Sequence, residues 1–332
     1  MGKKKDPKRN QRPEALWKEK DQIDGGTVDA MVLILRTSGC RWYRDGGCLM
    51  CGYHSASEEG IGIEDLRMQI DSSLERYDGE EMVKIYTSGS FLDTGEIPVG
   101  LRREVFEAFS ESQRILFESR PEFVSINNLE GIEVGKAHVA IGLETSSDLV
   151  RETCVNKGFT FQDYEKAASL LLEKGIPLRT YLLLKPPFLS EREAIRDVIS
   201  SIEDSSPYSE SISINPVNVQ RDTLVERLWR RGDYRPPWWW SLNEVLSKGL
   251  EASDARILSA PSGAGTPRGI HNCGDCEDKF IEAVRRFSFE QDLGVLRGLR
   301  CDCREEWETL IDVQDIMGTS VDVSRYLSSS KD

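Results

Sequence analysis

Short apolar runs recur along the first two thirds of the chain and are separated by segments with a different pattern. Each run is rich in β-branched or large aliphatic residues and is short, which is typical of a strand that is covered on both faces. We predict six such strands, at residues 30–35, 82–86, 114–117, 139–143, 178–184 and 211–215.

Apolar positions between these runs repeat with the period of a helix. The segments 63–77, 102–109, 161–174 and 191–203 show this period, and several follow a capping residue or end at glycine. The alternation of strands and helices predicts an α/β fold whose parallel sheet is either open or partly closed into a barrel. In such folds the active site lies beyond the carboxyl ends of the strands.

This alternation stops near residue 255 and divides the chain into three regions. We predict a basic N-terminal extension at residues 1–28, the α/β domain at 29–255, and a C-terminal lobe at 256–332. The stretch SAPSGAGTPRG at the start of this lobe is predicted to be a flexible connector, because it is rich in glycine, serine and proline.

The formal net charge of −14 limits the partners of the chain. It argues against binding nucleic acid by bulk electrostatics, because counterion release favours basic surfaces. The first twenty residues hold eight Lys/Arg against three Asp/Glu, which fits a local RNA contact or, equally, a solvated tail. No apolar stretch has the length of a membrane span, so we expect a cytoplasmic protein without membrane contact.

The eight cysteines fall into two clusters and one isolated residue. In a reducing compartment they are unlikely to form disulfides, and groups of three and four suggest two metal sites. Cys154 lies in a helical-looking stretch and is predicted to be a small buried apolar residue. The first cluster comprises Cys40, Cys48 and Cys51, and the second comprises Cys273, Cys276, Cys301 and Cys303.

The first cluster follows the first predicted strand, where Gly39, Gly46 and Gly47 let the backbone bend around a bulky group. One interpretation is a structural zinc site with His54 as the fourth ligand. The other is a [4Fe–4S] cluster that is held by three thiolates and has one iron open to an exogenous ligand.

The second cluster supplies two close pairs of thiolates, C-x2-C and C-x-C, separated by 24 residues. This pattern predicts a closed tetrahedral Zn²⁺ site that folds a small lobe. An auxiliary iron–sulfur cluster is the alternative, since spacing alone does not fix the metal.

The C-x7-C-x2-C pattern after the first strand resembles the radical S-adenosylmethionine (SAM) superfamily. The resemblance implies a partial (β/α)6 barrel in which the open iron chelates the methionine part of SAM. The long first gap is similar to that of the branch around the Elongator catalytic subunit. Met50 stands where the commonest pattern has an aromatic residue before the last cysteine, and we place it beside the cofactor.

Further stretches resemble that branch in the same order. YTSGSFLD follows the second strand, ESRPE the third, GLETSSD the fourth, NKGFT comes next and LLLKPPFLSE ends the fifth. The resemblance implies that the residues binding SAM are Gly89, Ser90, Glu118, Glu144, Lys157 and Lys185, with Arg151 as an alternative to Lys157. Taken singly, these residues also fit ordinary turns and surface ion pairs.

The same ordered set is similar to the radical SAM subunits of archaeosine synthases. That resemblance implies that a transglycosylase-like partner subunit attaches lysine to 7-cyano-7-deazaguanine at tRNA position 15. It also implies that the radical subunit then cleaves the lysine carbon–nitrogen bond and leaves archaeosine.

Other residues are open to more than one interpretation. Arg221, Arg227 and Arg230 follow the sixth strand and fit a substrate contact or a charged helix face. The three tryptophans of PPWWW at 236–240 fit an aromatic platform for a base or part of the core. The alternative functions are another radical SAM reaction on RNA, either Elongator-like or methylthiotransferase-like, and a non-redox zinc module that binds RNA or protein.

Overall fold

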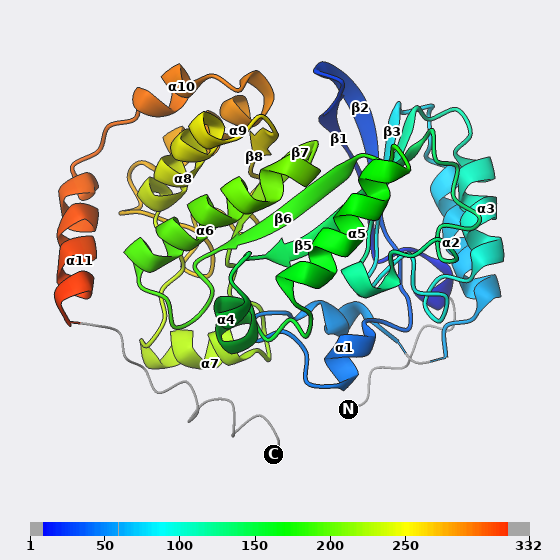
Figure 1. Ribbon diagram of the computed structural model, residues 1–332, viewed down its shortest axis with the longest axis horizontal. Coiled ribbons are helices and arrows are strands. Elements are labelled where there is room, and N and C mark those ends of the chain that lie inside the picture. Colours follow the sequence, from blue (N-terminus) through cyan, green and yellow to red (C-terminus); the bar gives the residue numbers. More distant parts are fainter. Residues whose placement is uncertain (1–8, 59, 318–332) are drawn as a thin grey trace. The chain divides into compact units, whose positions relative to one another are not determined.

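The computed structural model describes residues 9–58 and 60–317, in which strands and helices alternate along most of the chain (Figure 1). The chain forms two compact units. The first contains the described residues up to Arg44 together with Tyr53–Gly142 and Gln162–Leu178. The second contains Asp45–Gly52, Leu143–Phe161 and the described residues from Arg179 onward.

The first unit is built on strands in the order β1-β2-β3-β4-β5. β1 (Ala15–Ile23) and β2 (Gly26–Ile34) are antiparallel and are joined by Asp24 and Gly25, which both have positive φ. This Asp-Gly pair suits a two-residue hairpin, because its backbone twist matches that of the strands. β2, β3 (Met82–Tyr86), β4 (Arg114–Glu118) and β5 (Ala137–Glu144) then pair in parallel.

Helices of the first unit cover these strands with their apolar faces. They are α2 (Ile63–Leu74), α3 (Val99–Ala108) and α5 (Phe161–Glu173), with the short helices η1 (Arg9–Gln11), α1 (Arg41–Arg44), η2 (Tyr53–Ala56) and η3 (Pro121–Phe123) in the loops. The core between strands and helices contains fully buried Met31, Leu33, Ile85 and Phe117. Burying these side chains provides the main driving force for folding of this unit.

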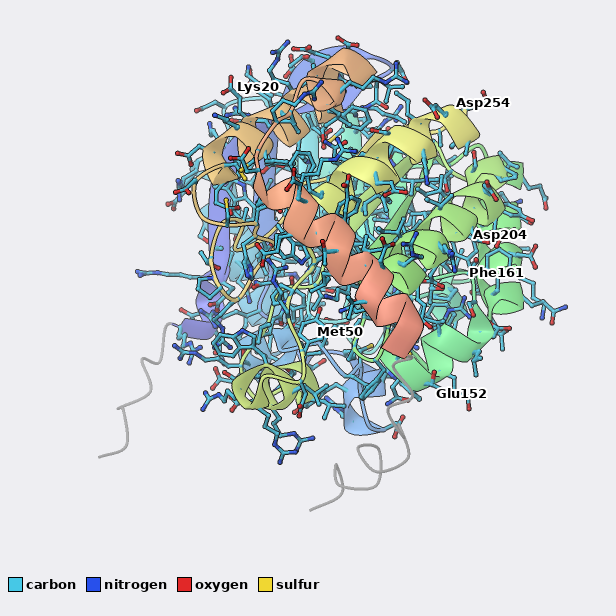
Figure 2. The ribbon with its side chains drawn as sticks, turned by 90° about the vertical axis from the view of Figure 1, so that its left-hand side faces the viewer. Lys20, Met50, Glu152, Phe161, Asp204 and Asp254 are labelled. Carbon is cyan, nitrogen blue, oxygen red and sulfur yellow. The ribbon has the colours of Figure 1, made fainter. Side chains whose placement is uncertain are left out.

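The second unit has three parallel strands in the order β6-β7-β8, which are β6 (Leu178–Leu184), β7 (Ser211–Pro216) and β8 (Arg256–Leu258). Its helices are α4 (Asp148–Val150), the π-helix η4 (Arg151–Val155), α6 (Glu191–Ser205), η5 (Ser206–Tyr208), α7 (Leu224–Arg231), α8 (Trp239–Ala252), α9 (Glu277–Glu290), α10 (Leu293–Arg297) and α11 (Cys303–Met317). α6 packs against α8 and α11, and α9 packs against β8 and α10. Figure 2 views the molecule with α11 in front of α8 and α6.

All six predicted strands and all four predicted helices form, with ends shifted by a few residues. Two strands were not predicted. β1 lies within the basic N-terminal extension, and β8 lies at the start of the proposed C-terminal lobe. The three-region division therefore stays a prediction. Among the described residues, none of the helices has the length and apolar character to span a membrane.

Candidate active site

Cys40 lies in the first unit, in the loop between β2 and α1. The preceding Gly39 has φ +84, and a Cβ atom there would come within 2.7 Å of the Ser57 side chain. Only glycine fits this position, because both the dihedral angle and the space exclude a side chain. The loop is thereby held in one path immediately before the cysteine.

A buried carboxylate, Glu96, links the loop after β2 to the loop after β3. It accepts hydrogen bonds from the Thr37 hydroxyl and from the backbone N–H of Ser90. Burial raises the pKa of Glu96, and these two hydrogen bonds act in the opposite direction. Glu96 stands three residues after the YTSGSFLD stretch, and sequence reasoning did not single it out.

Gly89 and Ser90, predicted to bind SAM, lie in this second loop. A Cβ atom on Gly89 would come within 2.9 Å of the Glu96 carboxyl carbon and 3.0 Å of the Cys40 Cα atom. The Ser90 hydroxyl accepts a hydrogen bond of 3.0 Å from the Arg120 N–H. The structure therefore brings the predicted methionine-binding loop directly against Cys40.

Glu118 is the last residue of β4, and its carbonyl accepts a hydrogen bond of 2.8 Å from the Phe91 N–H. The nearby Arg120 pairs with Glu122 at 2.5 Å and stacks on the Trp42 ring at 5.6 Å. The arginine thus joins the loop after β4 to the helix that follows Cys40.

Cys48 and Cys51 lie in the second unit, on a segment that is anchored at both ends. The Leu49 N–H donates to the Val155 carbonyl at 2.9 Å, and the Gly52 N–H donates to the Gln220 side chain at 2.6 Å. Between them, Leu49 and Met50 pack against an apolar cluster that includes Val155 and Val225. Met50 is therefore in place beside the cysteines through apolar packing.

Glu144 and Lys157, two further residues predicted to bind SAM, form an ion pair of 2.6 Å in the second unit. Both side chains are mostly buried, at 13% and 14% exposed. Glu144 ends β5 with φ 67, in the left-handed region that residues other than glycine rarely adopt. Such backbone strain at a strand end is common in ligand sites.

Lys185 follows β6, also has a left-handed backbone with φ 64, and pairs with Glu191 at 2.5 Å. Both charges are buried, and the Lys185 carbonyl accepts a hydrogen bond of 2.7 Å from Tyr234. Glu191 was not singled out from the sequence. It begins α6, whose helix N-terminus favours a negative charge.

Hydrogen bonds continue from Glu191 toward α11. Glu191 accepts from the Trp238 N–H at 2.8 Å and from the Ser241 hydroxyl at 2.6 Å. Ser241 in turn accepts from the Trp307 indole at 2.8 Å. Trp307 lies on α11, the helix that begins at Cys303. A polar chain therefore connects the end of β6 to the helix that carries a tail cysteine.

The residues around the first three cysteines fit a [4Fe–4S] cluster. None of the three cysteines is in a disulfide, and all three are partly exposed. Gly46 and Gly47 have positive φ between Cys40 and Cys48, and Asn156 fixes this bend by donating to the Gly47 carbonyl at 2.7 Å. Three thiols on a glycine-rich loop are the donor set of a cluster with one open iron. Cys40, Cys48 and Cys51 would hold it.

The four tail cysteines lie together in the second unit, with all sulfur atoms within 4.8 Å of one another. The Sγ atom of Cys273 lies 3.9 Å from that of Cys276 and 3.7 Å from that of Cys301. The Sγ atoms of Cys276 and Cys303 are 3.8 Å apart. These separations match the edge of a tetrahedron of about 3.8 Å that follows from a metal–sulfur bond of about 2.3 Å. They are too long for disulfides, and the thiols are free.

Neighbouring groups support thiolates in this tail site. The Trp240 indole donates to Cys303 at 3.3 Å, and the Asn272 amide donates to Cys276 at the same distance. Burial raises the pKa of the Cys276 thiol to about 11, so a bound cation is needed for the thiolate to form near neutral pH. Bonds to ligand sulfur of this kind orient the ligands of metal sites.

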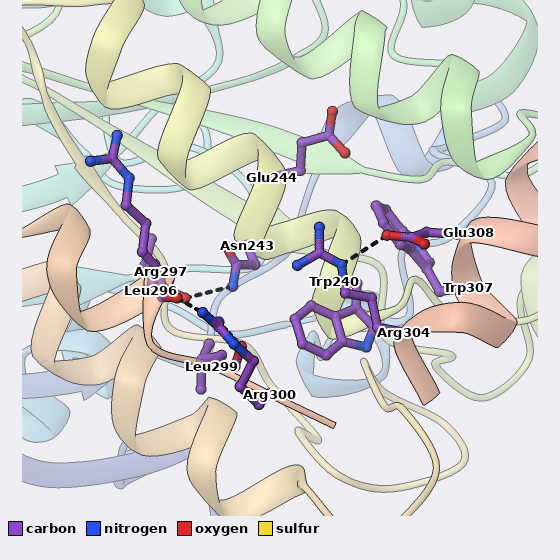
Figure 3. Close-up of a pocket in the computed structure, with 10 residues that line it drawn as sticks. All are labelled: Trp240, Asn243, Glu244, Leu296, Arg297, Leu299, Arg300, Arg304, Trp307 and Glu308. Carbon is purple, nitrogen blue, oxygen red and sulfur yellow. Dashed lines mark hydrogen bonds and ion pairs between the residues drawn. The ribbon is translucent and has the colours of Figure 1, made fainter. Parts of the chain in front are cut away.

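A pocket of about 570 Å³ lies beside the tail site (Figure 3). Arg304 extends over the Trp240 ring at 5.4 Å and pairs with Glu308 at 2.9 Å. Arg297 and Arg300 also line the pocket. Its residues come from α8, α10, α11 and the loop between the last two, and of these ten the sequence analysis considered only Trp240, as part of PPWWW.

Three other sequence hypotheses can now be decided. Trp238, Trp239 and Trp240 are at most 4% exposed, so they belong to the core, and of the three Trp240 also lines the pocket in Figure 3. Cys154 is 5% exposed and is a buried core residue as predicted. Arg151 is fully buried and donates to the Thr145 and Leu143 carbonyls, which is a structural role.

The fold defines a class, the partial α/β barrel, that solved structures also show. It resembles the Elp3 protein of the archaeon Methanocaldococcus infernus with a TM-score of 0.50, 17% identity, and coverage of 70% of this chain and 59% of that one. It also resembles methylornithine synthase (PylB), with a TM-score of 0.50, 15% identity, and coverage of 84% and 85%. The predicted partial barrel fold is thereby confirmed.

Sequence comparison identifies the group within that class. The chain is 40% identical over 320 residues to archaeosine synthase subunit beta of Methanosarcina acetivorans, covering 93% of this chain and 92% of the relative. It is 41% identical over 310 residues to the protein of the same name in Thermococcus kodakarensis, covering 89% and 96%. No family model matches the chain. The chain belongs to the archaeosine synthase subunit beta family, which decides against a non-redox zinc module.

Proposed function

We propose that this protein acts on tRNA and cleaves the lysine carbon–nitrogen bond of lysine-modified 7-cyano-7-deazaguanine at position 15, leaving archaeosine. The observation that carries the proposal is the 40% identity, over almost the whole length of both chains, to a relative named archaeosine synthase subunit beta. The three cysteines on the glycine-rich loop, none of which is in a disulfide, support it, since three thiolates would suit the ligand set of a radical SAM cluster.

The chemistry requires one hydrogen atom to be removed from the lysine methylene next to the bridging nitrogen. When bound, the cluster and SAM supply the carbon radical that takes this hydrogen, and SAM ends as methionine and 5′-deoxyadenosine. The methylene carbon would then lose one further electron, which the oxidised cluster would take back, and addition of water with release of a proton would break the carbon–nitrogen bond. The lysine side chain leaves as an aldehyde, and the nitrogen stays on the base.

The protein's own residues would bind and orient the reactants and exclude water. Gly89 and Ser90 would place backbone groups near the SAM amino group, because their loop lies against Cys40. Glu144 and Lys157 would bind SAM as a pair, exchanging part of their mutual ion pair for contacts to the cofactor. Lys185 is already neutralised by Glu191, so we assign it a positioning role at the end of β6.

Anaerobically reconstituted protein incubated with SAM, a reductant and lysine-bearing tRNA tests the proposed reaction. We expect equal amounts of archaeosine and 5′-deoxyadenosine by mass spectrometry of the digested products. Cys48→Ala should abolish both products. Cys154→Ala is the matched control, because this cysteine is buried away from solvent and has no predicted ligand role. Formation of 5′-deoxyadenosine while the lysine-bearing nucleoside persists would contradict the reaction and favour another radical SAM chemistry.

We further propose that the tail cysteines bind a single zinc ion. Four thiolates that bind one metal ion lie closer together than thiolates that bind different irons of a four-iron cluster. The tail sulfur atoms lie 3.7–3.9 Å apart, which fits a single ion. Zinc is the usual metal of closed four-cysteine sites of this kind.

Elemental analysis of cysteine variants tests the metal assignment. Replacing Cys40, Cys48 and Cys51 together should remove iron and leave about one zinc per chain. Replacing Cys273 and Cys301 should remove zinc and keep the iron. Iron retained in the tail of the first variant would overturn the assignment in favour of an auxiliary cluster.

The name of the relatives, subunit beta, supports a complex with a second subunit, which we propose to be the transglycosylase-like enzyme that attaches the lysine. Such a partner would carry much of the tRNA affinity that a chain of net charge −14 lacks. Co-elution of the two subunits by size-exclusion chromatography would support this; separate elution with undiminished conversion of tRNA would contradict it.

A further inference from the structure

The segment from Arg221 to Arg231 presents an exposed arginine surface, formed by the side chains of Arg221, Arg227, Arg230 and Arg231. Most of this segment is α7, which begins at the Thr223 cap and ends before Gly232, whose φ is 80. Leu224, Val225 and Leu228 are buried on the opposite side of the helix. Figure 1 shows α7 at the lower edge of the view.

Carboxylates do not neutralise this surface. Arg221, Arg227 and Arg231 form no ion pair with the described residues, and only Arg230 pairs with Glu226, at 3.0 Å. Glu226 is itself buried and also pairs with Arg268 at 2.7 Å, so its charge is used internally. The remaining exposed acids of the segment are Asp222 and Asp233. The segment therefore exposes four arginines but only two aspartates.

On other exposed helices of the chain, arginine and lysine side chains pair with a glutamate on the same helix. On α8, α9 and α11 a glutamate lies one turn away from the cation, as in Lys248–Glu244, Arg286–Glu290 and Arg304–Glu308. On α7 the residue one turn after Arg227 is Arg231. Like charges at this spacing destabilise a helix, so the arrangement is unfavourable unless an anion binds there.

The arginine surface is attached to the segment that carries Cys48 and Cys51. Gln220 accepts the hydrogen bond of 2.6 Å from Gly52, and a Cβ atom on Gly52 would come within 3.1 Å of the Arg221 carbonyl. At the start of α7, the Val225 N–H points to the Leu49 carbonyl at 3.5 Å. An anion on this surface therefore lies within a few residues of the cysteine segment.

From these observations we infer that the arginine surface binds the phosphate backbone of the tRNA next to the reacting nucleotide. The inference rests on the proposed function and adds where this acidic chain contacts its polyanionic substrate. Guanidinium groups bind phosphate oxygens in a fixed, often bidentate geometry, and several neighbouring arginines suit successive phosphates. The contacts would position the RNA and carry no information on its sequence.

Binding of unmodified tRNA to the full reconstituted chain, measured by fluorescence anisotropy over a range of KCl concentrations, tests this surface. The variant Arg227→Gln/Arg231→Gln keeps good helix formers and removes two charges. We expect about tenfold weaker binding and a salt slope smaller by roughly 1 to 2. Arg227→Lys/Arg231→Lys should restore most of the affinity. Arg286→Gln on α9 is the matched control and should bind like the wild type.

Two further readouts separate this inference from the proposed function. SAM cleavage without tRNA should be unchanged in the double glutamine variant, because neither arginine is placed at the cofactor. If the tRNA affinity and the salt slope of that variant are unaltered, the inference that the arginine surface binds tRNA is wrong. The proposed function would still hold in that case, provided that the wild type converts lysine-bearing tRNA. Failure of the wild type to convert that tRNA would instead refute the proposed function.

Discussion

Gly89 must be glycine because neighbouring atoms leave no room for a Cβ atom. Its φ lies outside the left-handed region, so the backbone conformation alone would allow another residue. The loop carrying it lies against Cys40 and the buried Glu96 carboxylate, so any Cβ atom must displace one of them. Overpacking of this kind costs about 1–3 kcal/mol, and here the displaced groups are a cysteine backbone and a hydrogen-bonded carboxylate.

Gly89→Ala should therefore lower the iron content after reconstitution and weaken SAM binding, while the protein still folds. Gly100→Ala is the matched control, because Gly100 lies on α3 and a Cβ atom added there would meet no other atom within 4 Å. Alanine there should keep full iron content and stabilise the protein slightly, since glycine is unfavourable inside helices. Equal iron and SAM binding in both variants would show that the Gly89 contact is unimportant.

Asp197 makes a second prediction at the residue scale. Thr145 donates to one carboxylate oxygen at 2.7 Å, and the other oxygen is buried without a hydrogen-bond partner. Burial raises the pKa of Asp197 to about 6. In the folded state the Asp197 carboxyl group therefore keeps a proton that it releases near pH 4 in the unfolded state. The contribution of this proton to the free energy of unfolding is lost as the pH rises toward 6.

Asp197→Asn should remove this pH dependence. The difference in unfolding free energy between variant and wild type should shift by about 2 kcal/mol in favour of the variant between pH 4 and pH 7. Denaturant titrations at a series of pH values measure it. A difference that is constant with pH would mean that the carboxyl group titrates normally in the folded protein.

At the scale of the secondary-structure element, ion pairs join the ends of β5 and β6 to the segments that follow them. Glu144 is the last residue of β5, and Lys185 directly follows β6. Both have a left-handed backbone, and each pairs with a group on a following segment. For Lys185 the partner is Glu191 on the first turn of α6, so the ion pair joins a strand to the helix after it.

Lys185→Met should destabilise the protein by about 3–5 kcal/mol, because it leaves the buried Glu191 charge uncompensated. The double variant Lys185→Met/Glu191→Gln should recover much of this loss, since no charge then remains buried. Chemical denaturation measures both. If Lys185 instead contacts SAM directly, the double variant will regain stability but will still bind SAM weakly, which isothermal titration will reveal.

The sequence predicts these elements better than it predicts their contacts. The buried parallel strands are evident because their apolar runs are continuous, and the cysteine clusters are evident from spacing alone. β1 escaped prediction because a continuous polar run, KEKDQ, fills most of Ala15–Ile23 and leaves apolar residues only at the ends of the strand, and β8 because it has three residues. Glu96 and Glu191 could not be found because their roles depend on partners distant in sequence.

At the scale of the whole molecule, the proposed tail metal site would hold together segments on either side of α9 and α10. Cys273 and Cys276 precede these helices, and Cys301 and Cys303 follow them. If a metal binds there, its removal would leave the four thiols held by weak contacts and the two N–H···S bonds, and the segment would lose one of its constraints.

Cys301→Ser should therefore increase hydrogen exchange in α9, α10 and the start of α11, and should lower the midpoint of thermal unfolding. α7 provides the internal control, since it lies outside the cysteine-closed segment and should keep its protection. Unchanged exchange in α9 and α10 would mean that apolar packing alone, through residues such as Phe280 and Phe287, fixes this part of the chain.

The polar chain from Lys185 through Glu191 and Ser241 to Trp307 has a consequence for how inhibitors of this enzyme are interpreted. A zinc chelator acting at the tail would loosen α11 and, through that chain, the position of a lysine at a strand end. Slower turnover after chelation would then report distant disorder and would not identify zinc as a participant in the bond-breaking step.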